Sequence, residues 1–175
     1  MLLALAAVLL ASAPAARPPA PDGPVTEVST LVIYRATAPP KLVTSYPAAD
    51  AAVPPGVLVL KLTFDQKMAP AGFDIAPLAA PPPGTESAPC LKTPRLLDDG
   101  RTFVLLCTLR AGRTYALAFN SAPSGGFANV TETRAAPAAL TFTTTRADPV
   151  RSLDEAMKAQ GLTRLEVPVQ DTPNL

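Results

Sequence analysis

Proline most constrains the fold of this chain, because it occurs 22 times in 175 residues and gathers in clusters. Proline fixes one backbone dihedral and removes a hydrogen-bond donor, so helices and central strands tend to stop at or before it. The clusters at positions 18–19, 39–40, 54–55 and 81–83 divide the chain into short extended pieces. This spacing disfavours a helical bundle and favours short strands joined by loops.

The most strand-like of these pieces runs from Val57 to Phe64 and leads into Met68. Its apolar side chains alternate with a period of two, which is the period of a strand with one buried face. The alternation predicts that the following residues point into the core: Leu58, Leu60, Leu62 and Phe64. Phe64 and Met68 are interpreted as core residues at the end of this strand.

Further short strands are predicted on both sides of this segment, at residues 42–44, 72–75, 90–97, 102–109, 113–120 and 139–145. Asp99-Gly100 between two apolar runs indicates a hairpin. The inward residues expected on the last two strands are Tyr115, Leu117, Phe119, Leu140 and Phe142. Two long loops, 76–89 and 121–129, complete the pattern. It predicts an all-β fold, an Ig-like antiparallel β-sandwich of about seven strands, over residues 41–146.

The N-terminal 16 residues form an apolar run followed by small residues, which is typical of a cleaved signal peptide. The run carries no Lys or Arg, and the alternative is an uncleaved N-terminal anchor. Residues 17–40 form a Pro-rich linker that we expect to be disordered. Within it, the β-branched run from Val28 to Tyr34 predicts one strand. This strand either joins the sandwich or pairs with a partner chain.

The C-terminal tail, residues 147–175, has a different character. Ser152 followed by Glu155 is a capping-box pattern, and Gly161 suits the position just after a helix. We expect a helix from this cap to about Gln160. Such a short helix is marginal unless it packs against the rest of the protein.

Charge and composition argue against several functions. The chain has 15 basic and 14 acidic residues, so no electrostatic footprint for nucleic acid follows. It has no histidine, which removes the commonest general base and metal ligand. Ser45, Ser121 and Ser124 have no nucleophile motif around them and are interpreted as loop serines. We therefore predict no enzyme activity, no catalytic residue and no cofactor.

Other polar residues are weighed in the same way. Four carboxylates, Asp65, Asp74, Asp98 and Asp99, lack the spacing of a calcium loop, so no metal site is predicted. Asp98-Asp99 is better explained by turn chemistry. Basic residues on the strands are interpreted as solvated: Lys61, Lys67, Arg110 and Arg113. Asn129-Val130-Thr131 matches a glycosylation sequon, a short and common pattern.

The only two cysteines, Cys90 and Cys107, lie on opposite arms of the predicted hairpin. They face each other if the turn is centred between residues 98 and 99, whereas a two-residue loop at 99–100 leaves them diagonal. Export favours a disulfide between them, and the alternative is two buried thiols. Closing a loop of this size is expected to stabilise the fold by about 3 kcal/mol.

Five segments in order resemble a bacterial Ig-like domain named after the S-layer protein SbsA. They are T-S-Y-P-A-A-D (44–50), L-T-F-D-Q-K-M (62–68), D-D-G-R-T-F (98–103), L-R-A-G-R-T-Y (109–115) and L-T-F-T-T (140–144). Two departures are Ala51, where the family has Gly, and residues 129–132, which replace a D-x-x-G-N loop whose ion-binding role is therefore not expected here. The resemblance implies an exported sandwich with a structural, spacer or adhesion role and no catalysis.

These observations predict an exported, non-catalytic Ig-like module, periplasmic or secreted, with a structural or protein-interaction role in the cell envelope. Its partner is expected to be an envelope protein, with no transmembrane span in the mature chain. The alternative function is an accessory domain that binds a peptide or carbohydrate through the loops 76–89 and 121–129. Those loops carry one aromatic residue, Phe127, which disfavours sugar stacking.

Overall fold

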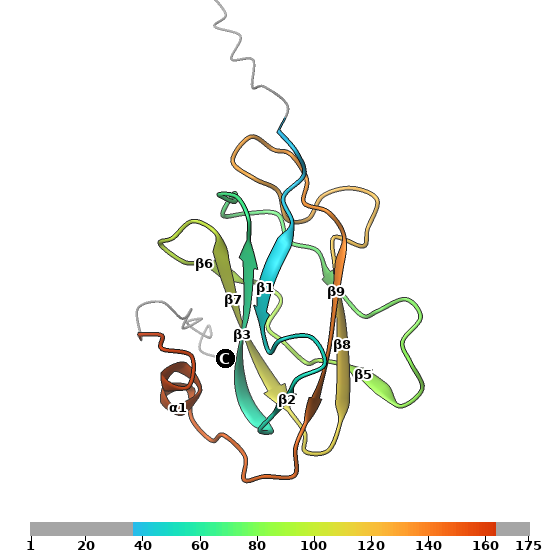
Figure 1. The fold of residues 1–175 in the computed structure, drawn as a ribbon, viewed down its shortest axis with the longest axis vertical. Helices are drawn as coiled ribbons and strands as arrows, with labels where there is room; N and C mark the ends of the chain where they lie inside the picture. Colours follow the sequence, from blue (N-terminus) through green and yellow to red (C-terminus); the bar gives the residue numbers. More distant parts are fainter. Residues whose placement is uncertain (1–36, 164–175) are drawn as a thin grey trace, which may run out of the picture. The chain divides into compact units, whose positions relative to one another are not determined.

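The computed structural model describes residues 37–163, and these form a β-sandwich with one short helix (Figure 1). One sheet, here called sheet A, has the strand order β1-β3-β7-β6, and every neighbouring pair in it is antiparallel. Its strands are β1 (Leu42–Tyr46), β3 (Gly56–Phe64), β7 (Thr102–Leu109) and β6 (Arg95–Leu96). The predicted all-β sandwich is confirmed.

The second sheet, sheet B, has the order β2-β9-β8-β4, with β5 also paired to β8. Its strands are β2 (Ala52–Val53), β9 (Ala138–Thr144), β8 (Thr114–Phe119), β4 (Ile75–Ala76) and β5 (Thr85–Ser87). The pairs β2–β9 and β5–β8 are parallel, so this sheet is mixed. The described residues therefore contain nine strands, and the prediction of about seven, all antiparallel, was too simple.

The predicted and observed strands differ mainly where the elements are short. The segment 76–89 is not wholly a loop, because β5 lies within it and adds to the edge of β8. The strand predicted at 72–75 begins only at Ile75, and the one predicted at 90–97 is regular only at 95–96. Pro77 directly follows β4 and Pro94 directly precedes β6, and a residue without an N–H cannot continue a ladder.

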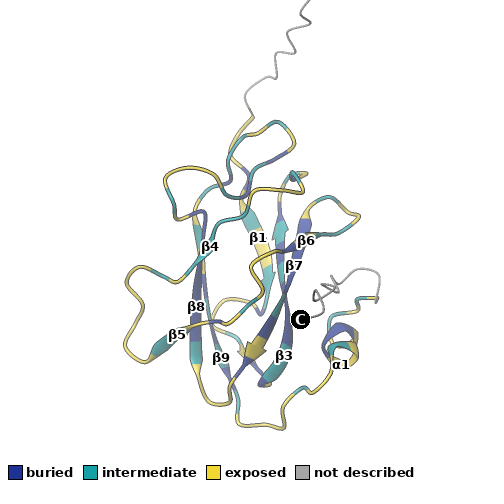
Figure 2. Ribbon diagram, turned by 180° about the vertical axis from the view of Figure 1, so that it is seen from behind, coloured by how far each residue is buried: buried dark blue, intermediate teal, exposed yellow. Residues whose placement is uncertain are grey.

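The core lies between the two sheets, and its composition follows the predicted faces. Leu58, Leu60, Leu62 and Phe64 of β3 are all buried in it. The inward residues predicted for β8 and β9 are buried as well, namely Tyr115, Leu117, Phe119, Leu140 and Phe142. Met68 is buried, as its interpretation as a core residue requires. Figure 2 shows this pattern, with buried central strands and exposed connecting loops.

The turn between β7 and β8 gives a physical reason for the motif L-R-A-G-R-T-Y. Leu109 and Tyr115 are buried, and Gly112 has a positive φ of 64° that suits glycine. The Tyr115 hydroxyl accepts a hydrogen bond of 2.8 Å from the backbone N–H of Arg110. A buried tyrosine that bonds the backbone a few residues upstream is a recurrent device of Ig-type sandwiches. The motif thus fixes the reversal of the chain from one sheet to the other.

The C-terminal helix forms as its cap predicts. Helix α1 (Leu153–Lys158) begins after Ser152, whose side chain accepts a hydrogen bond of 3.2 Å from the Glu155 N–H. The Glu155 carboxylate reaches back to the N–H of Arg151. At the other end Gly161 has a φ of 65°, and the Leu162 N–H bonds the Met157 carbonyl at 3.0 Å. This is the expected C-terminal motif with glycine in the left-handed conformation.

Helix α1 packs on the outer face of sheet A, which the sequence did not indicate. Ala156 and Met157 are buried against Val59 of β3 and Val104 of β7. These two valines point away from the main core, yet both are 0% exposed. The packing explains why so short a helix is stable, since helices of this length need tertiary contacts.

A backbone contact leads the tail from β9 to this position. The Val57 N–H donates to the Val150 carbonyl at 2.9 Å, and the Val150 N–H donates to the Pro55 carbonyl at 2.8 Å. A Cβ on Gly56 would lie 2.1 Å from the Val150 oxygen, so only glycine permits this approach. The tail is therefore attached to the first residues of β3 before the helix begins.

The predicted signal segment 1–16 and the predicted strand 28–34 lie outside the described residues. The last residues of the predicted linker, 37–40, lie inside and make defined contacts. Pro40 is buried, and its carbonyl accepts a hydrogen bond of 2.8 Å from Ala136. The Ala38 carbonyl accepts one of 2.8 Å from the Gln66 side chain. Defined contacts are therefore already present at Thr37, before Lys41.

Candidate functional site

The structure joins Cys90 and Cys107 in a disulfide, between the segment before β6 and strand β7. The hairpin pairs Arg95 with Val104. If this register continued unchanged along the two arms, the two cysteines would lie diagonally across from each other. They nevertheless face each other in an isolated bridge, because the first arm contains two more residues than β7 between these points. Pro94 lies in this irregular part. The register that the sequence left open is thus set by a local break in the strand.

A pocket of about 370 Å³ lies next to the disulfide, where β4 and the end of segment 76–89 leave the edge of β8 open. Its apolar lining includes Ile75, Ala88, Leu91 and Leu117, and its polar lining includes Asp74, Ser87 and Lys92. Leu91 is 37% exposed, so the pocket has an apolar rim. Both ends of the predicted ligand-binding loop 76–89 contribute to this pocket, through Ala76, Pro77 and Ala88.

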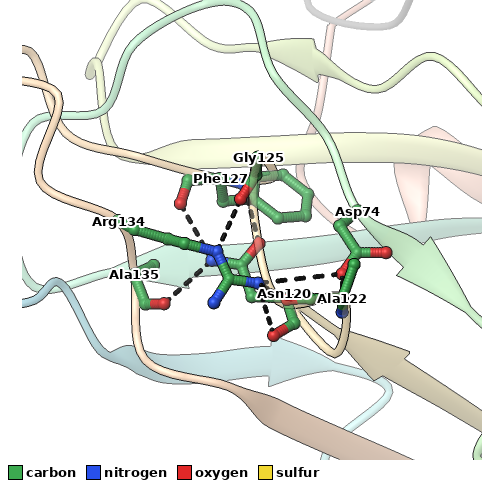
Figure 3. Close-up of polar contacts among 7 residues, drawn as sticks. All are labelled: Asp74, Asn120, Ala122, Gly125, Phe127, Arg134 and Ala135. Atoms are coloured by element: carbon green, nitrogen blue, oxygen red, sulfur yellow. Dashed lines mark hydrogen bonds and ion pairs between the residues drawn. The ribbon is translucent and has the colours of Figure 1, made fainter.

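The loop 121–129 is fixed from inside by a buried asparagine at the end of β8 (Figure 3). The Asn120 amide donates to the carbonyls of Phe127 and Ala135 at 2.8 and 2.9 Å, and its oxygen accepts from the Phe127 N–H at 2.7 Å. Asn120 is 1% exposed and has a φ of 54°, a conformation that Asn tolerates better than most residues. A Cβ on Gly126 would lie 2.2 Å from the Asn120 oxygen, so the loop needs glycine there.

Arg134 holds the same loop from outside (Figure 3). Its guanidinium donates to the carbonyls of Gly125 at 2.6 Å and Asn120 at 2.7 Å, and also to that of Ala122. The Asp74 carboxylate lies 4.0 Å from it and accepts a hydrogen bond of 2.7 Å from the Ala122 N–H. We call Asn120, Arg134 and Asp74 the loop clamp, because each of them bonds the backbone of this loop.

The loop clamp changes the interpretation of Phe127. This residue was the one aromatic available to stack on a sugar, but it is 1% exposed. Its ring packs against Phe64, Phe73 and Phe103, with centroid distances of 4.9–5.7 Å. Within residues 37–163 no aromatic side chain is exposed. Phe127 is therefore a core residue that anchors its loop.

Asn129, the first residue of the sequon match, has a similar structural role. Its oxygen accepts hydrogen bonds from the N–H groups of Thr131 and Thr133 at 3.1 and 2.8 Å. Its amide nitrogen donates to Thr37 at 2.7 Å and to Gln66 at 3.0 Å. Asn129 is 3% exposed, so its amide is not accessible for glycosylation in the folded protein. These bonds close a turn and attach the N-terminal segment to it.

Three of the four candidate carboxylates, Asp65, Asp74 and Asp99, accept hydrogen bonds from different local partners. Asp74 belongs to the loop clamp, and Asp65 accepts a hydrogen bond of 2.8 Å from the Lys41 N–H. Asp98 and Asp99 lie in the hairpin turn. No group of three or more potential ligands from His, Cys, Asp or Glu is present in residues 37–163.

Asp99 stabilises the hairpin turn, as the turn interpretation of D-D-G-R requires. Its carboxylate accepts from the N–H groups of Arg101 and Thr102 at 2.8 and 2.9 Å, and from the Thr102 hydroxyl at 2.6 Å. Partial desolvation raises the pKa of Asp99. The hydrogen bonds from Thr102 and Arg101 and the charge of Arg101 outweigh it, so the pKa lies below its ordinary value.

The remaining polar candidates lie on the surface or in turns. The Ser45 hydroxyl donates to the Pro47 carbonyl at 2.7 Å, while Ser121 and Ser124 are exposed on the loop surface. Lys67, Arg110 and Arg113 are exposed, and Arg113 forms an ion pair of 3.5 Å with Glu86. Lys61 is half-buried on the outer face of β3.

The loop clamp is what sequence reasoning missed. In the sequence Asp74 is a candidate only for a metal ligand, and Asn120 and Arg134 belong to no motif. The available signal was the dipeptide Gly125-Gly126 in the loop that follows Asn120, the residue directly after β8. Such a pair indicates backbone that approaches another group closely.

No protein-family model and no curated protein sequence matches the chain. Two solved structures of S-layer protein SbsC are similar to it. The crystal structure of rSbsC(31-844) matches at 18% identity with a TM-score of 0.41. The structure of SbsC domains 1–6 matches at 16% identity with a TM-score of 0.42. Each match covers 65% of this chain and 14% of the SbsC chain, so this chain spans a small part of those proteins.

The helix in the described range is too short to cross a bilayer.

Proposed function

We propose that this chain is an exported, non-catalytic Ig-like module of the SbsA type, with a structural or protein-interaction role in the cell envelope. One observation carries the proposal. The polar side chains that were candidates for chemistry, among them Asp74, Asp99 and Asn129, bond the backbone of loops and turns. A protein whose polar groups hold its loops in fixed shapes presents a rigid surface, which suits binding or spacing.

Two features support export. Residues 1–16 have the apolar run and small residues of a signal peptide. The Cys90–Cys107 disulfide fits an oxidising compartment, because such bonds persist outside the cytosol. The periplasm and the extracellular space are both consistent with this chemistry.

The proposal is tested by expressing the full chain with a C-terminal epitope tag and fractionating the cells. The expected result is a tagged product in the envelope or medium that begins after residue 16. A matched variant with Leu9→Arg and Leu10→Arg, which interrupts the apolar run, should remain in the cytoplasm. An uncleaved cytoplasmic product from the unmodified chain contradicts export.

The pocket beside the disulfide favours a second candidate, an accessory domain that binds an extended peptide. Its lining is apolar with a few polar groups, and no aromatic platform for a sugar is exposed in the described range. Selection from a displayed peptide library would test it. Peptides bound in this pocket should lose affinity for Leu91→Glu and retain it for Val130→Glu, a change at an exposed valine outside the pocket. Equal binding to both variants excludes this pocket.

A further inference from the structure

Strand β1 leaves one edge of sheet A open. It is the terminal strand in the order β1-β3-β7-β6, so one side of its backbone has no neighbouring strand among the described residues. The pairing with β3 shifts register between Leu42 and Thr44. Val43 lies at this shift and is 55% exposed, although valine favours a covered strand surface.

An apolar groove of about 360 Å³ runs along this edge. We call it the β1 groove, and it is lined by Leu42, Val43, Thr44, Ser45, Ala48, Ala49, Ala139 and Leu140. None of these residues is charged. Edge strands of monomeric proteins are usually protected by lysine, by proline or by a covering segment. An open edge beside an uncharged groove is a suitable acceptor for an added strand.

The chain carries a segment of matching character. Residues 28–34 read V-S-T-L-V-I-Y, with β-branched and aromatic residues that favour a strand. They lie outside the described residues and close to where these begin. The segment is long enough to cover the whole of β1, which has five residues.

The attachment of Thr37 argues against pairing of this segment with its own β1. The Thr37 hydroxyl is bonded to Thr133 and Asn129, at 3.1 and 2.7 Å, several residues before β1 begins. If the chain reversed its direction directly after Tyr34, the apolar residues of the segment 28–34 would lie opposite Ala38–Pro40. Pro39 and Pro40 have no N–H to donate, so that pairing is poor. A segment from another molecule has no such tether.

We propose that residues 28–34 of one copy add as a fifth strand to the β1 edge of a second copy and fill its groove. The inference rests on the proposed role as an interaction module and names its partner as this same chain. The backbone of the added strand pairs with β1, and alternate apolar side chains enter the groove. Contact through two different surfaces is heterologous, so it produces chains of molecules or a closed ring.

The test is sedimentation of purified residues 17–175, which contain both surfaces. The unmodified protein is expected to associate as its concentration rises. Val32→Lys in the added segment and Val43→Lys in the groove should each raise the dissociation constant on the order of tenfold or more. Val130→Lys is the matched control, since Val130 is 60% exposed outside the groove, and it should associate normally.

Mixing the two defective variants separates the alternatives. Val43→Lys still has an intact segment and Val32→Lys an intact groove, so the mixture should form heterodimers although each variant alone is monomeric. If the segment pairs with its own β1, the mixture stays monomeric and the proposal is overturned. It is equally overturned if the unmodified protein is monomeric throughout, or if neither lysine weakens association. Because association is measured on purified protein, its failure is distinct from a failure of export.

Discussion

Replacement of Arg134 by alanine should destabilise the protein more than its surface position suggests. Its guanidinium donates to three carbonyls of one loop, and 30% of the side chain is exposed. A hydrogen bond from a charged group contributes about 1.5–3 kcal/mol to stability. Water can replace part of this at a partly exposed site, so the loss is expected to be about 2–4 kcal/mol, below the sum of three bonds.

Two matched variants identify the source of the effect. Arg134→Lys keeps the charge near Asp74 but cannot reproduce the planar donor geometry, so it should recover about half of the loss or less. Arg110→Ala removes an exposed arginine side chain at the far end of β8 and should change stability by about 0.5 kcal/mol or less.

The chain has no tryptophan, so urea unfolding is best followed by far-UV circular dichroism. The free energy of unfolding comes from the linear extrapolation. In a thermal scan the same loss should lower Tm by roughly 6–15 °C. Limited proteolysis supplies a local readout, because release of the loop 121–129 should speed its cleavage. An Arg134→Ala protein with unchanged stability and unchanged proteolysis would show that Asn120, Asp74 and Phe127 hold the loop without Arg134.

Four further predictions concern other parts of the fold. Phe64→Ala should cost about 3–5 kcal/mol in the same urea assay, because Phe64 is 3% exposed, and a small change would refute its inward position. Met157→Ala should cost about 2–5 kcal/mol and detach helix α1; unchanged helix protection in hydrogen exchange would contradict this. Replacing both cysteines by alanine should cost about 3 kcal/mol, and dithiothreitol should lower the Tm of the unmodified protein but not of this variant. The folded-state pKa of Asp99 lies below its ordinary 3.8, so its stabilising contribution is present above that pH and is lost as the pH falls through the folded value. Asp99→Asn should therefore reduce the loss of stability that the protein shows at acid pH. If this loss is the same in the variant, it is caused by other carboxylates.

Local patterns predicted the elements whose formation depends on nearby residues. The alternation in β3, the Asp99 turn and the Ser152 cap each act over a few residues, so the chain itself reveals them. The position of helix α1 depends on Val59 and Val104, which come from two distant strands. The alternation pattern places these valines on the outward face of their strands, where exposure is expected. Their burial is apparent only from the contact with helix α1.

The loop clamp and the cysteine register depend on contacts that local sequence patterns specify only in part. Arg134 bonds residues up to fourteen positions away, and its partners are backbone carbonyls. Every residue type has such a carbonyl, so the sequence does not identify these partners. Cys90 and Cys107 face each other because of an irregular segment around Pro94, whose geometry no turn rule specifies. A resemblance carried by five short motifs predicted the sandwich but not the groups that fix its loops.

The central claim, an exported and disulfide-bonded module, is tested most directly by the intact mass of the chain recovered from envelope and medium fractions. The sample is alkylated without reduction before measurement. We expect a chain that begins after residue 16, lacks two hydrogens and carries no alkyl group, because Cys90 and Cys107 are joined. A chain that keeps its first 16 residues, is found only in the cytoplasm and is alkylated at both cysteines would contradict it.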